Sequence, residues 1–154
     1  MEEFDIAIIG GGPAGIMAAI AASADLNVVL LEKNSSLGSK LLITGGGRCN
    51  ITNEKPIKKL LNSFHDKNFL KHSFYTFTNE MLLDLFRNRG LDFIVEDNNR
   101  VFPETEKSQD ILAILKYYLK DITIKYNYEV SDIKKEDNFI INNDIIAEKI
   151  IIAT

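Results

Sequence analysis

The sequence predicts an α/β fold built on a parallel sheet, and three observations near the N-terminus support this. An apolar run at residues 4–9 ends at a glycine-rich turn. An alanine-rich stretch at residues 13–24 follows, and a second apolar run at residues 27–31 ends at Glu32. A strand, a helix and a strand within about 30 residues have the size of a βαβ unit.

Each of these three elements has its own local signal. Residues 4–9 lack strict alternation of apolar and polar positions, which is typical of a strand buried on both faces. Pro13 suits the first position of a helix, where its missing N–H has no partner to lose. Residues 27–31 form another short apolar run, so we expect a second buried strand.

The turn after the first strand carries a phosphate-binding pattern. Gly10, Gly12 and Gly15 form G-x-G-x-x-G. These glycines allow, in order, a tight turn, close approach of the backbone to a pyrophosphate, and close packing of helix on sheet. The helix N-terminus offers free N–H groups to the phosphates. Glu32 can accept hydrogen bonds from both ribose hydroxyls and would repel a 2′-phosphate, which disfavours NADP here.

A second glycine-rich loop favours FAD over NAD in this site. Lys40 precedes three consecutive glycines at residues 45–47, and Arg48 follows them. Such a backbone can approach a ligand or adopt positive φ, and Arg48 adds a planar, charged donor group. No Lys-Ser or Lys-Thr pair follows, so this is not a Walker loop. Two such loops suit a ligand with a ribityl chain and a flavin ring.

The remaining elements complete the predicted fold. Residues 56–89 are helical in pattern, with Asn79 as an N-cap and Gly90 ending the last helix. Ser108 can cap a helix at 109–119, and no strand is evident at 33–53. Further strands are predicted at 91–95, 100–102, 122–126, 129–134, 139–141 and 148–153. We therefore expect a three-layer FAD/NAD(P)-binding Rossmann-like domain, with a parallel sheet, an antiparallel meander at 129–141 and a helical insertion at about 54–120.

Composition excludes some classes of function. The formal net charge of −4 disfavours a nucleic-acid surface. The acidic N-terminus and the glycines that interrupt the first apolar stretch argue against a secretory signal and a membrane span. Cys49 is the only cysteine, which fits a reducing compartment. We expect a cytoplasmic protein without membrane or nucleic-acid partners.

Several residues are predicted to be structural. His65 and His72 lack the spacing of metal ligands, so no metal site is predicted. Cys49 lacks the partner that a disulfide oxidoreductase needs. A cluster of aromatic residues could form a substrate or nucleic-acid surface, but near-helical spacing favours a core role. This cluster comprises Phe64, Phe69, Phe74, Tyr75 and Phe77.

The chain resembles the BaiN-like (YhiN-like) bacterial NAD(P)/FAD-dependent oxidoreductases. The resemblance covers essentially all of the chain, and Gly-Gly-Gly-Arg-Cys-Asn at residues 45–50 is its most specific part. It is also carried by Ile-Ile-Gly-Gly-Gly-Pro-Ala-Gly at residues 8–15, Glu32-Lys33, Lys40, Thr44, Asn53, Phe74-Tyr75, Phe77-Thr78-Asn79-Glu80 and Arg100-Val101-Phe102-Pro103.

The resemblance implies FAD bound as in glutathione-reductase-like proteins. The implied pyrophosphate contacts are Gly10, Gly12, Pro13, Ala14 and Gly15. Glu32 would bind the adenosine ribose with Lys33 beside it, and the strand backbone at Val130 would meet adenine. The ribityl and flavin portion would lie along Lys40, Gly45, Gly46, Gly47, Arg48, Cys49 and Asn50. Ala153 and Thr154 look like the start of an Ala-Thr-Gly motif that also touches the cofactor.

The implied activity is that of a flavin oxidoreductase that passes a hydride between NAD(P)H, flavin and a small organic substrate. Two alternatives stay open: an FAD-dependent RNA-modifying enzyme, and a nucleotide-binding module without catalysis. The chain ends in an apolar strand at Thr154. We therefore expect residues 1–154 to be the FAD-binding part of a longer protein, without a substrate domain and inactive alone. No catalytic acid or base is predicted.

Overall fold

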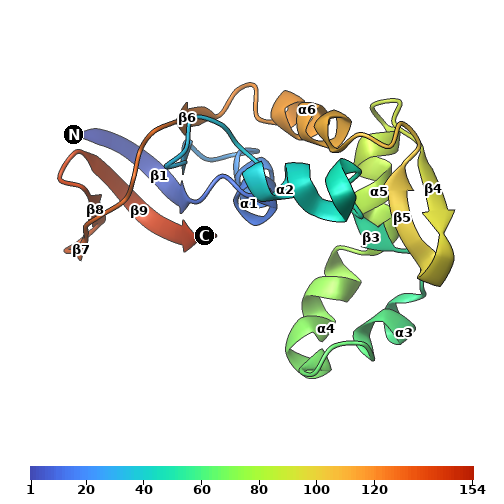
Figure 1. The fold of residues 1–154 in the computed structure, drawn as a ribbon. Coiled ribbons are helices and arrows are strands. Elements are labelled where there is room, and N and C mark those ends of the chain that lie inside the picture. The colour runs from blue at the N-terminus through green and yellow to red at the C-terminus, as the bar shows by residue number, and fades with distance from the viewer. The chain divides into compact units, whose positions relative to one another are not determined.

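The computed structural model describes every residue from Met1 to Thr154 and divides the chain into two compact units. The first unit contains Met1–Leu41 and Leu115–Thr154, and the second contains Leu42–Ile114. Figure 1 shows the elements of both units.

A six-stranded sheet forms the first unit, in the order β6-β2-β1-β9-β8-β7. Its parallel strands are β1 (Glu2–Ile9), β2 (Val28–Leu31), β6 (Thr123–Lys125) and β9 (Ile145–Ile152). All four residues of β2 are buried, as expected for a central strand of a parallel sheet. The predicted parallel sheet is confirmed, although β9 begins three residues earlier than expected.

The antiparallel meander is also present, as an extension of the same sheet. β7 (Ile133–Lys135) pairs with β8 (Phe139–Ile141), which pairs with the first residues of β9. Val130 lies outside these strands, so the predicted strand at 129–134 is wrong in its first part. The reason is local: Ser131 and Asp132 donate backbone N–H groups to the Asn142 side chain instead of to a neighbouring strand.

Helix α1 (Pro13–Ala22) packs on this sheet. It buries Gly15, Ile16 and Ala19. The core of the sheet contains Ala7, Ile9, Val29, Leu31, Ile141, Ile145 and Ala147. Apolar side chains of β1, β2 and the meander therefore meet in one cluster, which holds the carboxyl ends of β1 and β2 in place.

The second unit combines helices with a small antiparallel sheet, β3-β5-β4. The sheet is formed by β3 (Thr52–Asn53), β4 (Phe93–Glu96) and β5 (Arg100–Pro103). β3 is a strand that the sequence did not indicate, because two residues are too few for a periodic signal. The η2 turn (Asp97–Asn99) joins β4 to β5, with Asn98 and Asn99 at positive φ.

Besides η2, five α-helices and one further 3₁₀ helix have residues in the second unit. They are α2 (Ser39–Ile43), η1 (Thr44–Gly47), α3 (Ile57–Leu61), α4 (Lys67–Thr76), α5 (Asn79–Arg87) and α6 (Ser108–Tyr118). α2 and α6 cross the boundaries of the unit. None of the helices of the chain is both long and apolar enough to span a membrane.

Two predicted helix caps differ from the structure. Thr78, not Asn79, is the N-cap of α5, since its hydroxyl accepts from Met81 N at 3.2 Å. The Asn79 side chain instead donates to the carbonyls of Asn53 and Lys55. Ser108 is the first residue of α6, and its hydroxyl donates to the Leu42 carbonyl at 2.9 Å. In both cases the side chain expected to cap a helix instead donates a hydrogen bond to a backbone carbonyl that is distant in sequence.

Candidate functional site

The turn after β1 requires glycine at its first position. Gly10 has a φ of +110°, which L side chains rarely adopt. A Cβ there would lie 2.6 Å from the Ala153 carbonyl oxygen, and Gly10 N donates to the Leu31 carbonyl. The backbones of three strands therefore meet closely at this turn.

The other two glycines of the motif have opposite surroundings. A Cβ on Gly15 would lie 1.8 Å from the Gly10 carbonyl oxygen, so α1 can approach the turn only with glycine there. A Cβ on Gly12 would have no atom within 4 Å. Gly12 is also the N-cap of α1 and supplies no side-chain cap. Open space therefore lies before a helix end whose first N–H groups have no acceptor within the helix.

Glu32 is held in place by hydrogen bonds directly after β2. It is only 7% exposed. Its Oε2 accepts from Gly11 N at 2.8 Å, and its Oε1 accepts from Asn34 N at 2.8 Å and Asn34 Nδ2 at 2.6 Å. Each carboxylate oxygen can accept more than one hydrogen bond, so Oε2 keeps the capacity for another donor.

A cleft of about 620 Å³ lies at the carboxyl ends of β1 and β2. In open α/β sheets, ligands bind at this edge. Many of the predicted site residues line it: Gly10, Gly12, Pro13, Ala14, Glu32, Lys33, Lys40, Val130, Ala153 and Thr154. Gly15 stands behind them in α1, where it permits the close packing of the turn.

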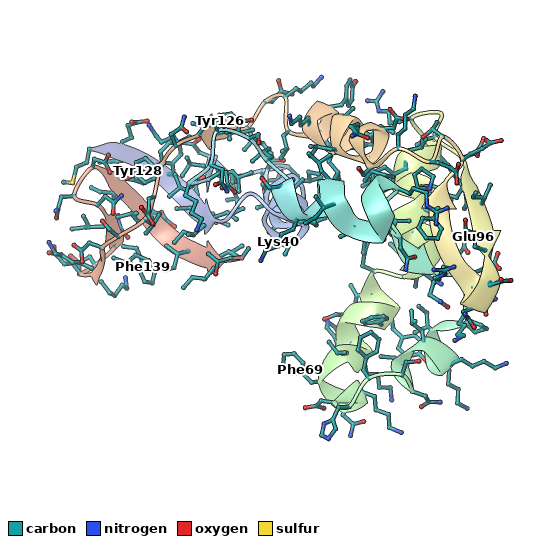
Figure 2. All side chains as sticks on the ribbon, viewed as in Figure 1. Lys40, Phe69, Glu96, Tyr126, Tyr128 and Phe139 are labelled. Carbon is teal, nitrogen blue, oxygen red and sulfur yellow. The ribbon has the colours of Figure 1, made fainter.

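The cleft also contains residues that sequence reasoning missed, notably Gly11, Asn34 and Tyr128. Tyr128 N donates to the Glu32 carbonyl at 3.0 Å, and its hydroxyl donates to Asp144. Burial, and then the Asp144 carboxylate, raise the pKa of Tyr128 above its ordinary value. Figure 2 labels Lys40 and Tyr128 in this unit. Asn34 could have been predicted from the sequence, because it lies only two residues after Glu32.

The second glycine-rich loop belongs to the second unit. Gly45, Gly46 and Gly47 all have positive φ, at 56°, 69° and 90°. A Cβ on Gly45 would lie 2.9 Å from the Phe102 ring, whereas one on Gly46 would have no atom within 4 Å. Gly45 is therefore needed for packing and conformation, and Gly46 for conformation alone.

Arg48 is engaged by acids of its own unit. Its Nη1 lies 2.6 Å from Glu96 Oε1 and 3.0 Å from Glu106 Oε1. Its guanidinium lies 4.2 Å from the centre of the Phe102 ring. The hydrogen bond from Arg48 lowers the pKa of Glu96, which keeps the pair charged. Arg48 therefore ties the second loop to β4 and to the turn before α6.

Cys49 and Asn50 end this loop differently. Cys49 is buried, at 4% exposure, and has a φ of +63°. Burial raises the pKa of its thiol more than a hydrogen bond with the Thr44 side chain lowers it. Such a thiol is not activated as a nucleophile at neutral pH. Asn50 is exposed.

Comparisons with known proteins agree with this geometry. The profile of a family described as HI0933-like protein Rossmann domain matches residues 4–154. A 3-dehydro-bile acid delta(4,6)-reductase of Clostridium scindens is 34% identical over 78% of this chain and 30% of its own length. A ribosomal RNA dihydrouridine synthase of Escherichia coli is 30% identical over 100% of this chain and 40% of its own.

A solved structure shows the same fold. The 3-ketosteroid-delta4-(5alpha)-dehydrogenase of Rhodococcus jostii RHA1 matches 99% of this chain and 46% of its own, with a TM-score of 0.71 at 14% identity. The chain therefore has the Rossmann-type fold of FAD-dependent oxidoreductases. It belongs to the HI0933-like Rossmann domain family, which confirms the resemblance to the BaiN-like proteins. The chain spans less than half the length of these two relatives.

Proposed function

We propose that this member of the HI0933-like family is the FAD-binding part of a flavin-dependent reductase. The observation that carries the proposal is the juxtaposition of Gly12 and Glu32 in one cleft. Gly12 leaves open space before the N-terminus of α1, and Glu32 presents a buried, oriented carboxylate at the end of the neighbouring strand. These groups fit the pyrophosphate and ribose of the adenosine half of FAD.

Different residues of the cleft would bind different groups of the adenosine half of FAD. The N–H groups at Ala14 and Gly15 would donate to the pyrophosphate, while Glu32 Oε2 would accept from a ribose hydroxyl. Tyr128 and Val130 also line the cleft and would contact adenine. A carboxylate at Glu32 would repel a 2′-phosphate, so the nucleotide in this cleft would not be NADP.

The second loop would serve the flavin half. In this proposal Lys40 and residues 45–50 lie along the ribityl chain and the ring. Because Arg48 is paired with Glu96 and Glu106, its role would be to hold the loop in shape. Gly46, with open space beyond it, would let the backbone approach the ligand.

The names of the two curated relatives share one chemistry. One reduces double bonds conjugated to a ketone, and the other reduces the uracil double bond, which is conjugated to a carbonyl. We infer the same class of reaction here, with NAD(P)H as the reductant. FAD, when bound, would supply the hydride that adds to the electron-poor carbon, and a proton would complete the reduction.

The two relatives indicate two substrate classes, a small enone and a base in RNA. The resemblance to the bile-acid enzyme favours a small substrate, whereas the RNA enzyme matches this chain from end to end. Both alternatives concern the intact protein, since the chain spans 30% and 40% of these two relatives. The cytoplasm, where NAD(P)H is available, is the proposed location.

The test uses the intact protein. It should purify with FAD, and anaerobic NADH or NADPH should bleach the visible flavin absorbance. A conjugated dienone or an unmodified ribosomal RNA should then restore the absorbance, and the product should gain two hydrogens by mass. A protein without flavin would contradict the proposal. A flavin that NAD(P)H does not reduce would favour the non-catalytic nucleotide-binding alternative.

A further inference from the structure

Helices α3 and α4 form a surface that the predicted roles of the chain do not explain. Figure 1 shows the two helices beside each other, at the lower end of the second unit. The aromatic cluster of this segment was expected to be core, and that expectation is wrong. None of its five members is buried, and Phe69 is 80% and Tyr75 53% exposed. α4 buries none of its ten residues.

The reason is that only part of the cluster packs. Phe64 and Phe74 meet edge to face, with ring centroids 5.3 Å apart, and this contact joins the α3–α4 connection to α4. Phe69 and Tyr75 make no such contact and present their rings to solvent. Figure 2 labels Phe69 on this helix. Two exposed rings on one short helix are not explained by packing within the chain, and exposed apolar groups of this kind often mark a binding surface.

The same segment is basic. Residues 55–76 contain five lysines and one acid, although the whole chain has a net charge of −4. The lysines are Lys55, Lys58, Lys59, Lys67 and Lys71, and none forms an ion pair. The one acid, Asp66, caps α4 by accepting from Phe69 N at 3.1 Å. The segment at residues 55–76 is therefore positively charged although the net charge of the whole chain is negative.

Lys71 and Tyr75 share one face of α4, and Lys67 lies on the same side one turn earlier. Asn68, Lys71, His72, Tyr75 and Thr76 line a shallow pocket there. A helix that binds a membrane would show a continuous apolar face, but this face alternates a ring with polar and charged groups. Single-stranded nucleic acid fits better, because its phosphates meet lysines and its unstacked bases stack on exposed rings.

We propose that the α3–α4 surface, defined by the five lysines with Tyr75, binds single-stranded RNA. The inference rests on the proposed function and deepens it, since it selects RNA as the substrate class of the reductase. The lysines contact phosphates, and Tyr75 stacks with a base. The surface thus holds the strand that carries the uracil to be reduced.

The test measures binding of a fluorescein-labelled, uridine-rich 16-nucleotide RNA to the intact, FAD-loaded protein by anisotropy at several salt concentrations. The double variant Lys67→Gln/Lys71→Gln should bind at least about 10-fold more weakly. Its salt slope should fall by about 1.4, because each phosphate contact to a single strand contributes about 0.7. The matched control, Lys107→Gln/Lys116→Gln, removes two exposed lysines elsewhere and should stay within about twofold of the parent.

Aromatic variants test the stacking contact separately. Tyr75→Ala should weaken binding about 5-fold or more, without changing the salt slope, because stacking of a base on a ring releases no counterions. Tyr117→Ala, on α6, is the control ring. Equal binding by parent and double variant, or loss with the lysine variants alone, would overturn the proposal. Lower thermal stability with unchanged RNA binding would also overturn it, by showing that the rest of the protein covers this surface.

The same preparations separate this inference from the proposed function. If the parent binds no RNA but keeps FAD and reduces a dienone with NAD(P)H, the RNA surface is wrong and the reductase stands. If the parent binds the RNA through this surface but carries no reducible flavin, the proposed function is wrong.

Discussion

The chain contains two glycine-rich loops, one in each unit, and glycine is present in them for different physical reasons. In the first loop, Gly10 and Gly15 are enclosed by backbone atoms at 2.6 Å and 1.8 Å from a would-be Cβ. In the second loop, Gly46 and Gly47 have no such close neighbour but have φ of 69° and 90°. Gly10 and Gly15 are therefore required by packing, with a positive φ at Gly10 as well, whereas Gly46 and Gly47 are required by backbone conformation alone.

Within the first loop, the glycines needed for folding differ from the glycine expected to contact a ligand. Gly12 lies between two enclosed glycines, yet it has an ordinary φ of −78° and open space around it. A side chain at Gly12 would therefore meet a ligand before it met the protein. Glycines of one motif can thus be tested one at a time.

The largest effect is expected for Gly15→Ala. The added Cβ would lie 1.8 Å from the Gly10 carbonyl oxygen, so α1 must shift away from the sheet. Overpacking of this kind should cost about 3 kcal/mol or more of unfolding free energy, measured by chemical denaturation of the intact protein. Gly12→Ala is the matched control and should cost about 1 kcal/mol or less. Equal stability of the two variants would contradict the packing difference.

Gly12→Val should abolish FAD binding while the protein remains folded. The branched side chain would occupy the space through which the pyrophosphate approaches the N-terminus of α1. The variant should purify colourless, with a circular dichroism spectrum like that of the parent. A yellow variant with the parent's flavin content would show that the phosphates lie elsewhere.

Glu32→Ala should weaken FAD binding about 10-fold or more, since a charged hydrogen bond is worth about 1.5–3 kcal/mol. It should also lower stability, because Gly11 N and Asn34 lose their acceptor. FAD titration and denaturation of the same sample separate the two effects. Glu129→Ala removes an equal charge from an exposed side chain in the same cleft. If it weakened FAD as much, general electrostatics would explain the result.

Gly46→Val should have the smallest effect. The positive φ of 69° would cost a branched residue about 1–2 kcal/mol. We expect a shifted flavin absorbance spectrum with little change in the affinity for ADP, which probes the adenosine half alone. Gly46→Asn should behave like the parent, because asparagine tolerates this conformation. Weaker ADP binding with an unchanged flavin spectrum would contradict the assignment of this loop to the flavin half.

Much of the fold was determined by the sequence itself. The turn at Gly10, the helix from Pro13 and the strand that ends at Glu32 follow from apolar runs and glycine spacing over contiguous residues. Their pairing in a parallel sheet follows as well, because a βαβ unit of this length has few alternatives. The position of the first loop at the carboxyl edge of the sheet was predictable for the same reason, since the pattern and its context occupy about 30 residues.

The tertiary structure decided what lay far apart in sequence. Arg48 finds Glu96 and Glu106, 48 and 58 residues away, and Tyr128 enters the cleft beside Glu32. Phe69 and Tyr75 face solvent although their spacing suited a core. The spacing of apolar residues predicts which face of a helix or strand a side chain lies on. It does not predict whether another element or solvent covers that face. What contacts a side chain depends on how elements that are distant in sequence pack against each other. These tertiary contacts, and not local propensity, determine whether the side chain is buried.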